Sequence, residues 1–296
     1  MNKFPAKQQS ISGRKDSPPS HATLMKHLVE IKERPAHYLI QRKIYLTTCE
    51  LDKLLTLKKN GEKFYAVMSH LPKLESLQLC HWVLFAIIGY LQDAIDMPLI
   101  IQTFNERSQF WNDLKGVIAM GLDVNKTFIY KYNDFSFMGQ DFDQKIIRVE
   151  KCVTFNSVSS QYLLMPCAVD HDPYFRMFRN KAPLYGLPEC GKINSAFLPP
   201  LLDTSVENSA IFLTDTSNQI ADKITKYYNS KKQDGVTDSD ILYPFLLCFI
   251  KGDLERSQDL KTKVIQTVTD VVEQYQSARE LVDDKILHQL MEKRFI

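Results

Sequence analysis

Residues 162–176 read YLLMPCAVDHDPYFR, and this stretch decides the fold class. The apolar run Tyr162–Val169 has the length of a buried strand. Two aspartates around a histidine follow, then a proline and two aromatic residues. Asp170 or Asp172 can accept hydrogen bonds from the free N–H groups of a helix, and Pro173 suits the first helical turn. We therefore expect a central strand that leads into a helix.

Further apolar runs of similar length precede this strand and alternate with amphipathic stretches. The expected strands are Lys63–Ser69, Met97–Phe104 and Lys126–Tyr132. The expected helices are Leu74–Asp93, Gln109–Gly121, Asp141–Val153 and Pro173–Ala182. Short buried runs separated by helices predict an α/β fold, a doubly wound parallel sheet with helices on both faces.

The last part of the chain has no convincing strand. The expected helices here are Ser217–Tyr228, Asp240–Ile250 and a long one over Asp253–Glu292. Thr216 followed by Gln219 is a capping-box pattern that starts the first of them. We expect three regions: a disordered, basic, Ser/Pro-rich arm (1–22), the α/β domain (23–207) and an all-α domain (208–296).

Composition and charge exclude several classes of protein. Of the 296 residues, 44% are hydrophobic and 24% charged, and the net charge of +2 indicates no particular partner. The most apolar stretch, Trp82–Ile101, is interrupted by Gln92, Asp93, Asp96 and Pro98, so it cannot span a membrane. The basic N-terminal segment is most simply a solvated arm, with contact to a polyanion as the alternative.

The six cysteines are scattered and form no CxxC pair. Without a signal-peptide pattern, we expect reduced thiols and a cytoplasmic location. The basic, Ser-rich start leaves a mitochondrial presequence open, and a nuclear location is not excluded.

Several blocks resemble one family in the same order along the chain. CAVDHDPYFRMFRNKAP is similar to the CAIDQDPYFRMTRD segment of cytoplasmic-type tryptophanyl-tRNA synthetases, which are class I aminoacyl-tRNA synthetases. RPAHYLIQRKIYL, YLQDAIDMPLIIQ, AMGLDVNKTFIY and SAIFLTDTSNQI also have counterparts there. The resemblance covers roughly residues 24–296. It implies a Rossmann-like catalytic domain followed by a helical anticodon-binding domain.

The resemblance also implies an activity and two signatures that serve it. The family activates tryptophan with ATP and transfers it to tRNA. Its HIGH motif packs against ATP, and its KMSKS-type loop supplies a cation for the pyrophosphate leaving group. Both signatures are degraded here. The HIGH motif has become QLCH: Gln78, Leu79, Cys80 and His81. The KMSAS stretch is absent, and no Lys or Arg lies between Lys192 and Lys223.

The implied tryptophan pocket is remodelled as well. A family tyrosine falls at Val67, a glutamate at Arg107 and a glutamine at His171, beside Asp170, whereas Gln102 is retained. A site that loses the partners of an indole N–H and an ammonium is strongly weakened. Three segments also appear shortened: after Trp111, between residues 158 and 165 where the family carries its dimer insert, and after residue 253.

We considered local chemistry that is independent of the resemblance. His70, His81 and His171 could form a metal site, but solvent-facing histidines explain them better, so we expect no metal. Cys80 beside His81 could suggest a thiol nucleophile, but neighbours on one helix rarely face each other. The CAVDHDPYFR motif is explained by strand packing and helix capping, and a retained ligand pocket is the alternative.

The sequence therefore favours a pseudoenzyme that binds RNA or a protein partner and needs no ATP, with no catalytic residue intact and no family-type homodimer. A residual tryptophan–tRNA ligase is the second hypothesis, and a small-molecule sensor that uses Val67, Arg107 and His171 is the third. The partner and the biological process are not determined by the sequence.

Overall fold

The computed structural model describes residues 26, 28, 30, 36–49, 51–62, 64–68, 77–103, 107–131, 162–167, 176, 177, 180, 189–195, 210–250 and 259–292. The arm 1–22, the expected helix Asp141–Val153 and most of the expected helix Pro173–Ala182 lie outside these residues. The domain boundaries at 22/23 and 207/208 stay predictions.

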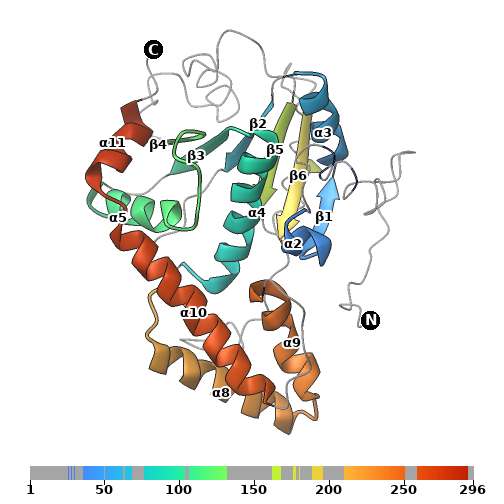
Figure 1. Cartoon of the computed structure of the whole chain (residues 1–296), viewed down its shortest axis with the longest axis vertical. Coiled ribbons are helices and arrows are strands. Elements are labelled where there is room, and N and C mark those ends of the chain that lie inside the picture. Colours follow the sequence, from blue (N-terminus) through green and yellow to red (C-terminus); the bar gives the residue numbers. More distant parts are fainter. Residues whose placement is uncertain are drawn as a thin grey trace.

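Six strands form one sheet, in the order β1-β6-β5-β2-β3-β4 (Figure 1). Strands β2 to β6 are parallel, and β1 joins the β6 edge antiparallel. The predicted α/β fold is confirmed, with this antiparallel edge strand as a correction. The bounds are β1 Tyr45–Cys49, β2 Phe64–Met68, β3 Leu99–Thr103, β4 Thr127–Lys131, β5 Tyr162–Cys167 and β6 Glu189–Ser195.

The described helices of the first part lie around the sheet, whereas most of those of the second part form a separate layer and the last one returns to the β4 edge of the sheet (Figure 1). The connections β2–α4–β3 and β3–α5–β4 are crossovers between parallel strands, which the doubly wound pattern requires. The helices are α2 Tyr38–Gln41, α3 Leu51–Lys59, α4 Leu79–Ile95, α5 Arg107–Ile118, α8 Ser217–Gln233, α9 Asp238–Phe249, α10 Leu260–Glu280 and α11 Asp284–Glu292.

The prediction of one long helix over Asp253–Glu292 is wrong. The chain leaves the helix after Glu280 and starts α11 at Asp284. The carboxylate of Asp283 explains the restart, because its Oδ1 accepts the backbone N–H of Ile286 at 2.8 Å and so caps the new helix. The capping box of α8, in contrast, is confirmed between Thr216 and Gln219.

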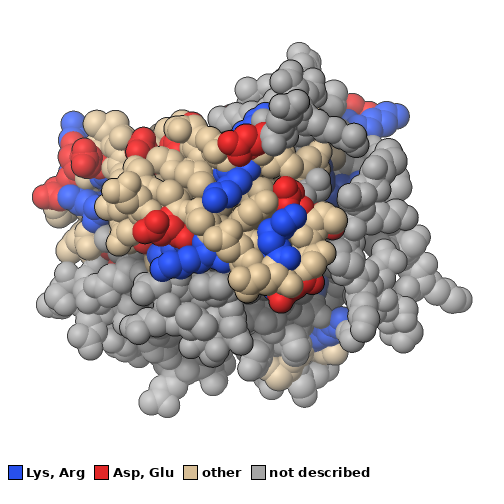
Figure 2. Space-filling view, turned by 90° about the horizontal axis from the view of Figure 1, so that it is seen from below, with Lys and Arg blue, Asp and Glu red and all other residues tan. Residues whose placement is uncertain are grey.

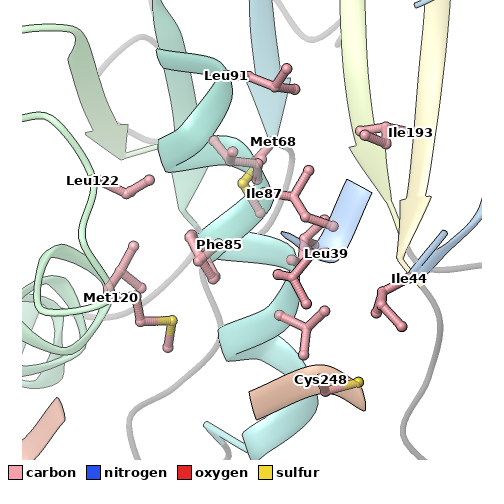
Figure 3. Close-up of a cluster of buried hydrophobic side chains, with 14 of the residues drawn as sticks. Leu39, Ile44, Met68, Phe85, Ile87, Leu91, Met120, Leu122, Ile193 and Cys248 are labelled. Atoms are coloured by element: carbon pink, nitrogen blue, oxygen red, sulfur yellow. The ribbon is translucent and has the colours of Figure 1, made fainter. Parts of the chain in front are cut away.

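Helix α4 lies at the centre of the core. It is almost entirely apolar, and Figure 3 shows Phe85, Ile87 and Leu91 among side chains from other elements, such as Met68, Leu122 and Ile193. Its approach to the turn before β4 is very close. A Cβ at Gly89 would lie 2.9 Å from the carbonyl oxygen of Gly121. The turn at Gly121 therefore packs directly against the middle of α4.

Two of the regions that hold the helical part on the α/β part lie at α9 and at α5. At the first, Arg42 of the turn after α2 donates to the backbone oxygens of Leu247, at 3.0 Å, and Ile250, which end α9. The hydroxyl of Tyr38 donates to the backbone oxygen of Cys248 at 2.8 Å. At the second, α10 contacts α5, and α11 contacts α5 and β4.

Candidate functional site

The strand order reverses at β2, which lies between β3 and β5. In open α/β sheets ligands bind outside the carboxyl ends of the strands at such a switch point. Strand β2 ends at Met68 and β5 at Cys167, and the chain between Met68 and Leu77 and between Cys167 and Arg176 lies outside the described residues. Of the residues around this switch point, the structure therefore describes the amino end of α4 and the segment 211–213 that bonds to it.

The residues of QLCH at the start of α4 bond to one another. The backbone N–H of Gln78 donates to Nδ1 of His81 at 2.9 Å, and the Cys80 thiol donates to the side-chain oxygen of Gln78 at 3.6 Å. Burial raises the pKa of the Cys80 thiol. A thiol with a raised pKa is a poor nucleophile. The two side-chain hydrogen bonds described above join Cys80 and His81 to Gln78 and not to each other.

Residues 211–213 form backbone hydrogen bonds with the amino end of α4. Gln78 and Phe212 form an isolated antiparallel bridge. The N–H of Leu79 donates to the carbonyl oxygen of Ile211 at 2.9 Å, and the N–H of Leu213 donates to Leu77 at 2.8 Å. The first free N–H groups of a helix can bind an anion, but that of Leu79 is already bonded within the chain.

Lys223 is the first lysine or arginine after Lys192 in the sequence. It lies next to this bridge and forms an ion pair. Lys223 of α8 and Asp215 are 2.7 Å apart, and their side chains are only 13% and 8% exposed. The same carboxylate oxygen accepts the N–H of Phe212 at 2.8 Å. The Lys223 ammonium also lies 4.8 Å from the centre of the Phe212 ring. Lys223 therefore stabilises the segment from Phe212 to Asp215.

Helix α10 fixes the same segment from the other side. The side-chain amide of Gln276 donates to the backbone oxygens of Leu213, at 3.1 Å, and Asp215, at 3.0 Å. Sequence reasoning missed Asp215, Lys223 and Gln276. The available signal was an aspartate eight positions before the first lysine of α8, which is too common a spacing to single out.

The structure describes the predicted pocket residues only in part, and the pocket stays a prediction. Val67 is buried in β2, where it pairs with Ile100. Gln102 lies in β3 opposite Tyr130 and Arg107 begins α5, but the side chains of Gln102 and Arg107 are outside the description. Asp170 and His171 lie entirely outside it.

Neither a metal cluster nor a membrane span is found in the described part of the chain. No group of three or more His, Cys, Asp or Glu residues there could hold a metal ion. None of the helices within those ranges is both long enough and apolar enough to cross a membrane.

No family model matches the chain. It is, however, 28% identical to the human cytoplasmic tryptophan–tRNA ligase over 340 residues, which cover 88% of this chain and 72% of the relative. The corresponding protein of Arabidopsis thaliana is 27% identical over 350 residues, which cover 92% and 87%. The chain is a homologue of the tryptophanyl-tRNA synthetases. The resemblance of the sequence blocks is thereby confirmed.

Solved structures of tryptophanyl-tRNA synthetases share the fold. The Plasmodium falciparum protein is similar with a TM-score of 0.74 at 24% identity, over 92% of this chain and 93% of the other. A tryptophanyl-tRNA synthetase homologue from Entamoeba histolytica reaches 0.75 at 17% identity, over 93% and 92%. The overall architecture is therefore that of the synthetases.

Proposed function

We propose that this tryptophanyl-tRNA synthetase homologue no longer activates tryptophan and serves as a binding or scaffold protein in the cytoplasm. One observation carries the proposal. No Lys or Arg lies between Lys192 and Lys223, and Lys223 is held by a largely buried Asp215 at 2.7 Å. The cation that the family loop supplies to the pyrophosphate leaving group has no replacement in this stretch.

The expected loss of activity is large. Removing one group that stabilises transition-state charge costs about 2.7–4 kcal/mol, or roughly a hundred- to a thousand-fold in rate. Here the loop cation, the first histidine and the glycine of the HIGH motif are all changed. Because such losses are not additive, we do not sum them, but a single one is sufficient to make turnover very slow.

The amino end of α4 supports the same proposal. A phosphate would need the free N–H groups of the helix and a close approach to its backbone. The N–H groups of Gln78 and Leu79 are bonded to His81 and Ile211, and Cys80 has a side chain where the motif has glycine. We therefore expect neither ATP nor tryptophan to bind.

A residual tryptophan–tRNA ligase is the second candidate, and the similarity to named ligases over 88% of the chain favours it. It would require a cation from elsewhere to replace the lost loop.

The partner is better explained as a protein than as RNA. Figure 2 shows a face of the helical part on which lysine and arginine side chains alternate with aspartate and glutamate. Between residues 208 and 296, acidic residues slightly outnumber basic ones. Binding of RNA relies on neutralising many phosphates with a concentrated positive charge, which this face does not offer. With the dimer insert shortened, we also expect no homodimer of the family type.

Tryptophan-dependent exchange of pyrophosphate into ATP tests the proposal. We expect no exchange above background by the purified chain, and no thermal shift with ATP or tryptophan, while the human cytoplasmic enzyme serves as the positive control. If exchange occurs, Lys223→Met shows whether Lys223 is the source of the missing cation.

A further inference from the structure

Two donor groups on α10 are buried and have no hydrogen-bond partner in the described part of the chain. They are the hydroxyl of Tyr275, a residue that is only 3% exposed, and the Nε–H group of Arg279. A buried polar group without a partner costs free energy, and in a native fold it is usually explained by a bound ion or water molecule. The two donors therefore mark a candidate binding site.

The two donors lie on the same side of α10. Residues four positions apart in a helix are one turn apart and are neighbours on its surface. Burial raises the pKa of the Tyr275 hydroxyl to about 12, and the guanidinium of Arg279 opposes that rise, so its charge acts at the hydroxyl. One small ligand between them can accept hydrogen bonds from both groups.

The half-buried guanidinium of Arg279 has a neutral partner. It donates to the side-chain oxygen of Asn112 on α5, and it forms no ion pair within the described ranges. The carboxylates that follow it in the chain are exposed: Glu280, Asp283 and Asp284. The last of these lies 3.3 Å from the ammonium of Lys115. A partly buried positive charge without a paired carboxylate favours an anionic ligand over a cationic one.

The surroundings of the two donors limit the size of the ligand. Asn112, the partner of Arg279, lines a groove of about 440 Å³ between α5 and α11, which gives solvent ions access to this region. The hydroxyl of Tyr275 and the Nε–H group of Arg279 lie beneath the surface. The site therefore suits a small ion and not a bulky organic anion.

We propose that Tyr275 and Arg279 bind a small monovalent anion, with chloride as the simplest case. The hydroxyl and the Nε–H group would both donate to this ion. Because α10 reaches α5 at this end and Arg279 bonds to Asn112 there, the ion would stabilise the contact between the helical part and the α/β part (Figure 1). The inference goes beyond the proposed loss of catalysis and does not depend on it.

The NMR line width of chloride measures binding directly, because a bound chloride nucleus relaxes much faster than a free one. The native full-length chain is titrated with sodium chloride, while sodium methanesulfonate keeps the ionic strength constant. We expect a saturable excess line width, which sodium bromide removes by competition.

Two variants each change one of the two donors. Tyr275→Phe removes only the hydroxyl, and Arg279→Gln removes the positive charge with the Nε–H group. Each should weaken chloride binding by roughly tenfold or more. The matched controls are Tyr227→Phe, which changes another buried tyrosine, and Lys285→Gln, which removes an exposed cation from α11. Neither control should change the binding.

Urea unfolding gives a second readout that a merely structural hydroxyl would not move. With chloride at about ten times its dissociation constant, the ratio of folded to unfolded native chain should rise roughly tenfold at constant ionic strength. The same addition should leave the ratio for Tyr275→Phe nearly unchanged.

Three results would overturn the proposal. The first is the absence of saturable broadening with the native chain, which would leave a neutral partner such as water. The second is equal chloride binding by the native chain and Tyr275→Phe. The third is an equal loss in Lys285→Gln and Arg279→Gln, which would indicate an adventitious ion only. None of these results bears on pyrophosphate exchange, so the two proposals fail separately.

Discussion

At the scale of single residues, the ion pair of Lys223 and Asp215 has the largest consequences. A lysine near a substrate cleft is useful to catalysis only if its ammonium can reach the substrate. Here the ammonium is 2.7 Å from a carboxylate in surroundings where both side chains are almost buried. The pair stabilises the bridge between Phe212 and the start of α4 and is thus part of the fold.

Asp215→Ala should lower the free energy of unfolding by about 3–5 kcal/mol, because it leaves a largely buried ammonium without its partner. It also removes the acceptor of the Phe212 N–H. Urea unfolding checks this result. Lys231→Ala is the matched control, because Lys231 and its partner Asp234 are 42% and 60% exposed. This change should lower the free energy of unfolding by less than about 1 kcal/mol. Equal effects of the two changes would contradict the account.

Cys248 should make the protein sensitive to alkaline pH. Burial raises the pKa of its thiol from the ordinary 9.0 to about 12. The unfolded chain loses this proton near pH 9 and the folded chain near pH 12, so stability falls as pH rises through this window. Cys248→Ala should lose less stability than the native chain between about pH 8 and pH 10, as measured by urea unfolding. If stability falls equally with pH in the native chain and in Cys248→Ala, the Cys248 thiol is not the source of the alkaline sensitivity.

At the scale of elements, the sequence predicts the four strands that are continuous apolar runs. Strands β1 and β6 were missed because neither is a continuous apolar run: YLTTC contains two threonines, and ECGKINS is largely polar. Their positions follow from pairing, since β6 needs β5 and β1 needs β6. The break between α10 and α11 was missed because the apolar periodicity continues across it, with Val282 buried.

The predictability of the site follows the same division. The sequence QLCH and the stretch without Lys or Arg between Lys192 and Lys223 are visible without a structure. The bridge of Gln78 to Phe212 is a backbone contact between distant segments and leaves no pattern in the sequence.

Gly89→Ala tests the close contact of α4 with the turn before β4. An alanine in a helix is normally favourable by up to about 1 kcal/mol relative to glycine. At this position its Cβ would lie 2.9 Å from the backbone oxygen of Gly121, so we expect a net loss of about 1–2 kcal/mol. The melting temperature and urea midpoint report the sign, and stabilisation would show that the contact is looser.

Arg42→Met tests the attachment of α9. Methionine keeps an apolar stem but removes the donors to the backbone oxygens of Leu247 and Ile250. We expect the free energy of unfolding to fall by about 2 kcal/mol and the amides in the last turn of α9 to exchange faster. Arg42→Lys retains the charge and one flexible donor, so its stability should lie between those of the native chain and the Arg42→Met variant. If α9 exchanges at the native rate in the methionine variant, the attachment does not depend on Arg42.

At the scale of the whole molecule, the fold of the synthetases is retained, and the loss of the groups that their chemistry requires is our proposal. A fold does not by itself imply a function, which depends on the residues of a site. The segment from Ile211 to Asp215 connects the two parts of the chain and is bonded to α4, α8 and α10. These bonds fix the segment 211–215 relative to the amino end of α4.

The measurement that tests this account most directly is tryptophan-dependent exchange of pyrophosphate into ATP by the purified full-length chain. The account predicts no exchange above background, under conditions in which the human cytoplasmic enzyme is active. Tryptophan-dependent exchange above background would contradict it, because a working active site would then exist without the loop cation that this chain lacks.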